Sequence, residues 1–151
     1  MPPLSEQDQW PAQLEGPFGF LFTRGFRVIA SSEYRLGEWT VLANDFAGLF
    51  LDGDADSQAF RAAAVRLDQG RLPERWLTAQ SPPVMLSLKE VADLLAPDSL
   101  RGLADLPPLS TQSDRLPHLK FWARVLQAVA APWLDGDREW FERTARQLSS
   151  L

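Results

Sequence analysis

The sequence contains no cysteine among its 151 residues. This absence excludes disulfides, thiolate-ligated zinc, iron–sulfur clusters and thiol nucleophiles together. A chain of this length buries roughly 68–70% of the surface that its unfolded form exposes, which lets one domain fold without a metal or a cross-link. We therefore expect a single domain over residues 1–151, in a reducing, cytoplasmic compartment and without a cofactor.

Long apolar runs and a basic leader are also missing. No stretch of about 18 apolar residues occurs, so no membrane-spanning helix is expected. Residues 1–9 are polar and acidic and lack the features of a signal peptide. Because three prolines and Gly16 interrupt the beginning of the chain, we expect residues 1–16 to be loosely ordered, with a short helix over 5–10.

Basic residues are fewer than acidic ones, and the net charge is -5. This balance argues against binding to nucleic acid or to an anionic membrane, both of which attract clustered Lys and Arg. The acidity is uneven, since no basic residue lies between Arg35 and Arg61. Two interpretations stay open: a solvated hairpin surface, or a negative face that steers a basic partner protein. The carboxylates in this stretch are Glu38, Asp45, Asp52, Asp54 and Asp56.

Three short segments early in the chain have the alternation and the β-branched or aromatic content of strands. They cover residues 26–33, 38–43 and 46–51, with turns expected at 44–45 and 52–54. Strands at this spacing predict an antiparallel meander.

Residues 57–67 are ambiguous. They are rich in alanine, which favours a helix, but their second half alternates, so we favour a fourth strand at about 60–67. A loop is expected over 68–86, where three prolines and a glycine fall. The predicted fold is α+β, with an antiparallel meander of three to four strands and helices packed on one face.

Helices are expected on both sides of this sheet segment in the sequence. Residues 18–24 form a short apolar helix that Gly25 ends. Ser87 and Glu90 have the spacing of a capping box at the start of a helix that runs to about Leu95.

The C-terminal third is predicted to be helical. One helix begins at Ser113 or Asp114 and ends near Ala131, because Pro132 follows. A final amphipathic helix follows Asp137.

Catalytic and metal-binding patterns are weak. His118 is the only histidine, so no second imidazole or thiolate is available to share a metal. The alternating carboxylates at 52–56 resemble the start of a calcium loop, but Ser57 and Ala63 stand where glycine and glutamate are required. Glycine-rich phosphate loops are absent. We expect neither an enzyme nor a metal site.

Six tryptophans are many for this length. Trp122 and Trp140 lie on helical apolar stripes and are expected in the core. Trp39 lies in a predicted strand and can face either side of the sheet. Trp10, Trp76 and Trp133 lie near proline-rich or turn segments, where they either pin loops to the body or are exposed binding residues.

Three segments of the chain carry a family resemblance. They are residues 20–22 leading to 25–29 with 32–34, then 37–42, and finally 123–126 followed by 132–137 and the closing helix. Together they resemble a group of small uncharacterised bacterial proteins, some related to immunity proteins encoded beside secreted toxins. The resemblance implies a non-enzymatic α+β domain that binds another protein.

The sequence thus predicts a non-enzymatic, cytoplasmic protein-binding domain, immunity-like, that engages a basic partner through an acidic sheet face. Two alternatives remain from other classes. One is a small-ligand or carbohydrate module that uses exposed tryptophan. The other is an oligomeric structural protein, such as a homodimer, whose sheet edge pairs with its own copy.

Overall fold

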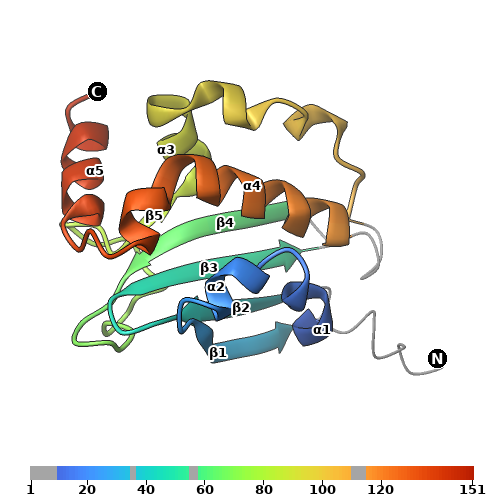
Figure 1. The fold of residues 1–151 in the computed structure, drawn as a ribbon, viewed down its shortest axis with the longest axis horizontal. Helices are drawn as coiled ribbons and strands as arrows, with labels where there is room; N and C mark the ends of the chain where they lie inside the picture. Colours follow the sequence, from blue (N-terminus) through green and yellow to red (C-terminus); the bar gives the residue numbers. More distant parts are fainter. Residues whose placement is uncertain (1–9, 35–36, 55–57, 110–114) are drawn as a thin grey trace.

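The protein is built around one open antiparallel sheet, seen in a computed structural model that describes residues 10–34, 37–54, 58–109 and 115–151 (Figure 1). Its strands lie side by side in chain order, β1-β2-β3-β4-β5. The predicted α+β meander is confirmed, with five strands instead of three to four. The elements are α1 (Trp10–Glu15), α2 (Gly19–Phe22), β1 (Arg27–Tyr34), β2 (Gly37–Ala43), β3 (Ala47–Asp54), β4 (Ala59–Arg66), β5 (Met85–Ser87), α3 (Leu88–Leu95), the 3₁₀ turns η2 (Pro97–Leu100) and η3 (Leu103–Asp105), α4 (Arg115–Leu134) and α5 (Trp140–Ser149).

The two strands at the end of the sheet account for the difference in number. The ambiguous segment 57–67 does contain a strand, β4, as favoured from its alternation. The fifth strand, β5, has three residues and pairs with Ala63, Ala64 and Val65. A strand this short shows no alternation, so its sequence reads as part of a loop.

The turn predicted at 52–54 is wrong, because β3 continues to Asp54. Gly53 lies within the sheet, opposite Glu38 on β2 and Phe60 on β4. A Cβ atom at Gly53 would lie 3.2 Å from Cδ of Arg115. The glycine therefore makes room for a side chain from α4, rather than for a turn.

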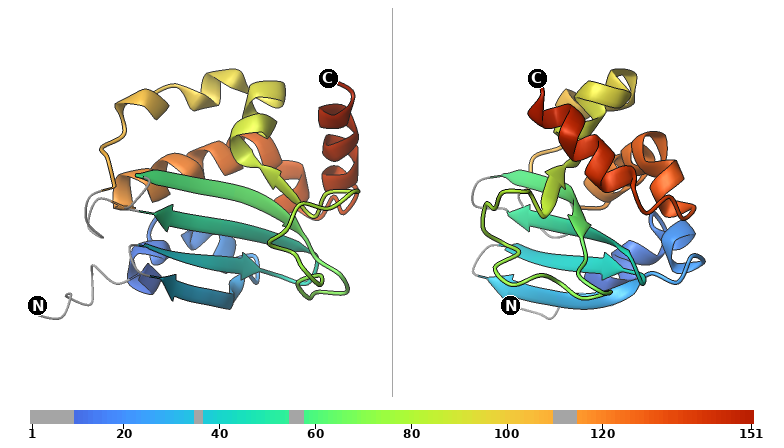
Figure 2. Two further views of the ribbon diagram at one scale, coloured as in Figure 1. Left: turned by 180° about the vertical axis from the view of Figure 1, so that it is seen from behind. Right: turned by 90° about the vertical axis from the view of Figure 1, so that its left-hand side faces the viewer.

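The two faces of the sheet are covered differently, as Figure 2 shows. The helices pack on one face, as predicted, with α4 lying along it. The segment between β4 and β5 crosses the other face, where Leu72 and Trp76 pack on Val41 and Phe50. Because side chains alternate along each strand, both faces supply core residues. The strand residues of the main core are Leu42, Ala47, Leu49, Leu51, Ala62, Ala64 and Leu86.

The N-terminal helices differ from the prediction. Residues 1–9 lie outside the described part of the chain, and the next six residues form α1 instead of a loose segment. The helix predicted over 18–24 is present as the shorter α2, and Gly25 follows it with φ of +83°. Glycine adopts this left-handed conformation without steric cost, so it suits the exit from the helix.

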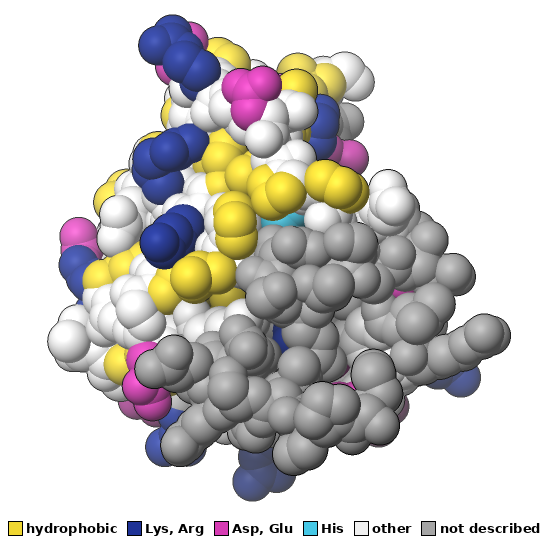
Figure 3. Space-filling model, turned by 90° about the vertical axis from the view of Figure 1, so that its right-hand side faces the viewer, with side chains coloured by type: hydrophobic (Ala, Val, Ile, Leu, Met, Phe, Trp, Pro, Cys, Tyr) yellow, Lys and Arg dark blue, Asp and Glu magenta, His cyan; other side chains and the backbone are white. Residues whose placement is uncertain are grey.

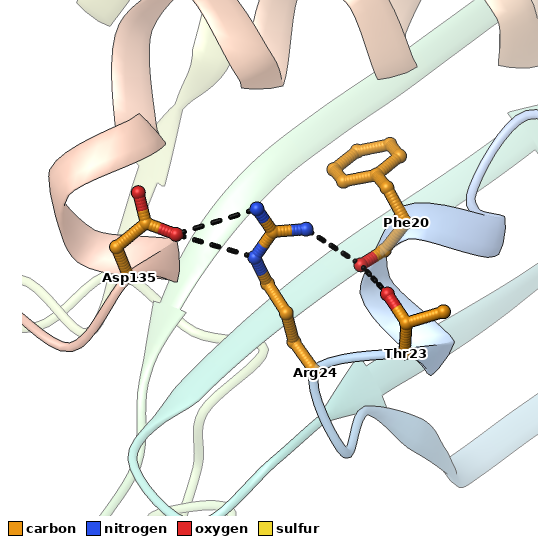
Figure 4. A network of polar contacts seen from close by, with 4 residues as sticks. All are labelled: Phe20, Thr23, Arg24 and Asp135. Carbon is orange, nitrogen blue, oxygen red and sulfur yellow. Dashed lines mark hydrogen bonds and ion pairs between the residues drawn. The ribbon is translucent and has the colours of Figure 1, made fainter.

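Arg24 ties this N-terminal region to the end of α4 (Figure 4). Its Nε and Nη2 atoms each donate to Oδ1 of Asp135 at 3.3 Å, and its Nη1 donates to the carbonyl of Phe20 at 2.9 Å. The side chains of Arg24 and Asp135 are 40% and 64% exposed, so the pair contributes little stability.

The start of α3 corrects a second prediction. Ser87 occupies the N-cap position but makes no side-chain cap hydrogen bond. Ser87 is also the last residue of β5, so its backbone is set by pairing with Ala63 rather than by a capping box. The helix ends at Leu95, as predicted.

The C-terminal helices are both present, but their bounds differ from the prediction: α4 ends later than expected, and α5 begins only at Trp140, with Glu139 rather than Asp137 at its N-cap. Residues 113–114 lie outside the described part, and α4 continues past Ala131 to Leu134. Pro132 does not end this helix but coincides with a kink, where Ala130 has φ of -123°. Proline lacks an N–H donor and its ring clashes with the preceding turn, which explains the distortion. None of the helices in the described residues is long and apolar enough to span a membrane.

Candidate functional site

The five carboxylates predicted to face a partner do not lie on one face of the sheet. Glu38 faces the helices and is 8% exposed. Its Oε1 accepts a hydrogen bond from Nη1 of Arg115, the first residue of α4, and both side chains of this ion pair are buried. A cation at a helix N-terminus is unfavourable for the helix dipole, so Glu38 gives Arg115 a compensating partner.

Asp52 lies on the other face of the sheet, away from the helices. Its cross-strand partners are Trp39 on β2 and Arg61 on β4. It is 3% exposed and accepts hydrogen bonds from two side chains. Tyr34 donates its hydroxyl to Oδ1 at 2.5 Å, and Arg61 donates Nε to Oδ2 at 3.0 Å. Asp52 is thus an internal anion held by two donors.

The other two carboxylates that the structure describes, Asp45 and Asp54, lie near opposite ends of β3. Asp45 is exposed in the turn between β2 and β3. The turn predicted at 44–45 is confirmed, and Asn44 Oδ1 accepts a hydrogen bond from the backbone N–H of Ala47 at 2.9 Å. Asp54 is half-buried at the other end of β3. Asp56 lies outside the described residues. That Asp45 and Asp54 contact a partner stays a prediction.

Tyr34 has an unusual environment, although 40% of its surface is exposed. Burial of the hydroxyl, followed by its hydrogen bond to Asp52 and the charge of that carboxylate, raises the pKa of Tyr34 well above its ordinary value. The neutral phenol is therefore stabilised in the folded state.

Because Tyr34 is the only tyrosine, its ionisation can be followed alone by phenolate absorbance. Its pKa is raised on folding, so its contribution to stability is complete below the ordinary pKa of about 10 and is lost as pH rises through the raised value. We expect no phenolate step near the ordinary pKa in the folded protein, and a normal step in concentrated guanidinium chloride. Asp52→Asn should move the folded-state pKa back down; a normal step in the folded wild-type protein would contradict the geometry.

His118 is in a structural position. It is 8% exposed, its Nε2 donates to the carbonyl of Pro107 at 2.7 Å, and its ring stacks on Phe60. Figure 3 shows the histidine, in cyan, next to a group of hydrophobic side chains at this end of the molecule. In the described ranges, no three His, Cys, Asp or Glu side chains come together in a way that could hold a metal ion.

The tryptophans whose side chains the structure describes are packed, not fully exposed. Trp122, Trp133 and Trp140 are buried in the main core. Trp39 and Trp76 are half-buried and meet edge to face, 5.2 Å between ring centroids, on the sheet face opposite the helices. Trp76 thereby pins the segment after β4 to the sheet, as one of the two interpretations predicts.

The free edge of β1 is the most exposed part of the sheet. Seven of its eight residues are exposed, and Val28 and Ile29 show 44% and 36% of their surfaces. Among the described residues, β1 pairs only with β2. A bulge interrupts its register between Val28 and Ala30, after which pairing is regular to Tyr34.

A hollow of about 370 Å³ lies at the opposite edge of the sheet, beside β4. It forms there because β5 pairs only with residues 63–65 and the chain then turns away into α3. Phe60 and Arg61 of β4, Lys89 of α3, Leu103 of η3 and Trp122 of α4 contribute to its wall.

Sequence reasoning missed this hollow and the partners of the buried carboxylates. Glu38 and Arg115 are 77 residues apart, and no local signal links them. Strand alternation explains why the two carboxylates separate. Glu38 pairs with Gly53, and Asp52 is the next residue along β3, so it points to the other face of the sheet.

No protein-family model, curated protein or solved structure matches this chain. The class that the geometry defines is an α+β meander with one helix-covered face, a long exposed edge strand and a hollow at the other edge.

Proposed function

We propose that this chain is a non-enzymatic protein-binding domain that receives an extended segment of its partner along β1. The observation that supports the proposal most is the exposure of this strand. An edge strand presents unpaired N–H and C=O groups, which bind another strand, while flanking side chains give specificity. The exposed Val28 and Ile29 supply apolar contacts next to that edge.

Charge favours a basic partner, although not through a single acidic face. The net charge of -5 attracts a cation-rich protein over a distance and raises its rate of association. The resemblance to immunity-type proteins suggests a toxin domain as the partner. Because Glu38 and Asp52 are buried, we expect the attraction of a basic partner to come from the net charge of the molecule and from exposed carboxylates such as Asp45.

The proposal is tested by placing two lysines on the edge strand, Val28→Lys with Ile29→Lys. Both side chains are exposed, so the variant should fold normally, while the new charges oppose addition of a strand. We expect affinity for the partner captured from native cells to fall at least about tenfold, or 1.4 kcal/mol. The measurement is calorimetric titration with the purified partner.

The matched control is Leu77→Lys with Leu95→Lys, which makes the same change of charge at two leucines of similar exposure outside β1. It should bind normally. Equal affinity of both double variants would remove β1 from the interface, and failure to capture any partner would count against protein binding itself. Light scattering separates the homodimer alternative, because a second copy bound along β1 would dissociate in the first variant only.

A further inference from the structure

We propose that the hollow beside β4 binds a small molecule with an apolar body and a carboxylate end. This site is independent of the β1 edge and goes beyond protein binding. Its volume, about 370 Å³, is within the range of about 300–1,000 Å³ typical of small-ligand sites.

The apolar part of the wall comes from both sides of the strand edge. Phe60, Leu103 and Trp122 belong to the side of the main core, whereas Phe50 and Met85 belong to the opposite face. The hollow therefore wraps around β4 where β5 stops, and an apolar chain placed there is removed from water on several sides.

The charged groups in the wall all have the same sign. Arg61 and Lys89 contribute to it, and no acidic side chain does so among the residues that the structure describes. Charge complementarity therefore selects an anion over a neutral or cationic ligand.

Lys89 is the cation more available to a ligand. It forms an ion pair with Asp93, one helical turn away, at 3.2 Å between Nζ and Oδ2, with both side chains more than half exposed. An exposed pair of this kind is weak, so the ammonium can turn to a ligand. Arg61 already donates to Asp52, which holds its guanidinium beside the hollow.

Trp122 provides the second, independent indication. The residue is 4% exposed and lines the hollow, and its indole N–H has no hydrogen-bond acceptor in the described part of the protein. Buried donors are rarely left unpaired in native proteins. The N–H is itself buried in the free protein, so the indole ring must turn toward the hollow when a ligand binds, and a carboxylate oxygen there would supply the acceptor that this N–H lacks.

The test uses decanoate as the probe, with decanol and decylamine as matched ligands that keep the chain and change the head group. Binding is followed through the indole N–H resonances of the full chain, with Trp122 assigned from Trp122→Phe. We expect a saturable shift of the Trp122 signal with decanoate, and weaker binding of decanol and decylamine by about tenfold or more.

Two variants make the test specific to the hollow. Lys89→Glu should weaken decanoate binding about tenfold, whereas Lys120→Glu, an equal charge change at an exposed residue of α4 outside the wall, should leave it unchanged. Trp122→Phe keeps the apolar wall but removes the donor, so its affinity for decanoate should fall while its affinity for decanol stays the same.

Three results would overturn the proposal: no saturable shift with decanoate, equal binding of decylamine, or equal losses in the two lysine variants. A carboxylate can also come from the end of a peptide. N-acetyl-trileucine and its amide distinguish that source: tighter binding of the peptide acid than of decanoate would assign the site to a protein C-terminus. These results leave the β1 test unaffected, since the two sites lie at opposite edges of the sheet.

Discussion

Replacing Arg115 with methionine is expected to lower the free energy of unfolding by about 3–5 kcal/mol, because the change leaves the carboxylate of Glu38 buried without its cation. Arg115 is 4% exposed, and Glu38 is held in β2 beneath the start of α4, out of reach of bulk water. Removal of one partner from a buried ion pair lowers the free energy of unfolding by more than the intact pair contributes to it. Urea unfolding followed by tryptophan fluorescence measures the effect.

A double variant separates two contributions to the loss of stability: the loss of the ion pair, and the burial of the Glu38 carboxylate without a cation. Glu38→Leu combined with Arg115→Met replaces the ion pair with apolar side chains, and it should recover most of the lost stability. Arg24→Met is the matched control, since its pair with Asp135 is exposed and should contribute only about 0–1 kcal/mol. A loss in Arg115→Met no larger than in this control would show that the buried pair is not as the structure describes it.

A second large effect is expected at Gly37. Alanine there should destabilise the protein by about 2–3 kcal/mol, because the new methyl group overlaps neighbours that cannot move away freely. A Cβ atom at Gly37 would lie 2.6 Å from the hydroxyl of Tyr34 and would also press on the backbone carbonyl of Gly53 in the paired strand. The glycine is therefore needed for close approach.

The Gly37→Ala variant has its own spectroscopic readout. Displacement of the Tyr34 hydroxyl weakens its hydrogen bond to Asp52, so the pKa of Tyr34 should fall toward its ordinary value. Gly19→Ala is the control, since a Cβ atom at Gly19 has no neighbour within 4 Å and the residue begins α2. That variant should be as stable as the wild-type protein, and equal losses in both would contradict the close packing at Gly37.

The elements with a clear local pattern could be predicted from the sequence. Alternation and β-branched residues placed the first four strands, and the apolar stripes placed α4 and α5, because these periods depend only on backbone geometry. Turn chemistry was a less dependable guide. Asn44 does begin a turn, but the Asp-Gly-Asp at 52–54 continues β3. Its glycine leaves room for the side chain of Arg115 instead of forming a turn.

The candidate sites depended on information that no local pattern carries. Acidic residues that are close in sequence were expected to share one surface, yet Glu38 and Asp52 point to opposite faces and find cations from α4 and β4. Likewise, the hollow exists because β5 ends after three residues, and its wall combines side chains from β3, β4, β5, α3, η3 and α4.

The sequence by itself thus determined the fold class, the order of the main strands and helices and the absence of cysteine chemistry, since each follows from local periodicity or from composition. Only the tertiary structure decided which charges are buried, which strand edge is exposed and where a hollow remains. Those properties depend on which residues distant along the chain meet when the apolar faces are buried together, and β1, β4 and α4 meet their neighbours only in the folded chain.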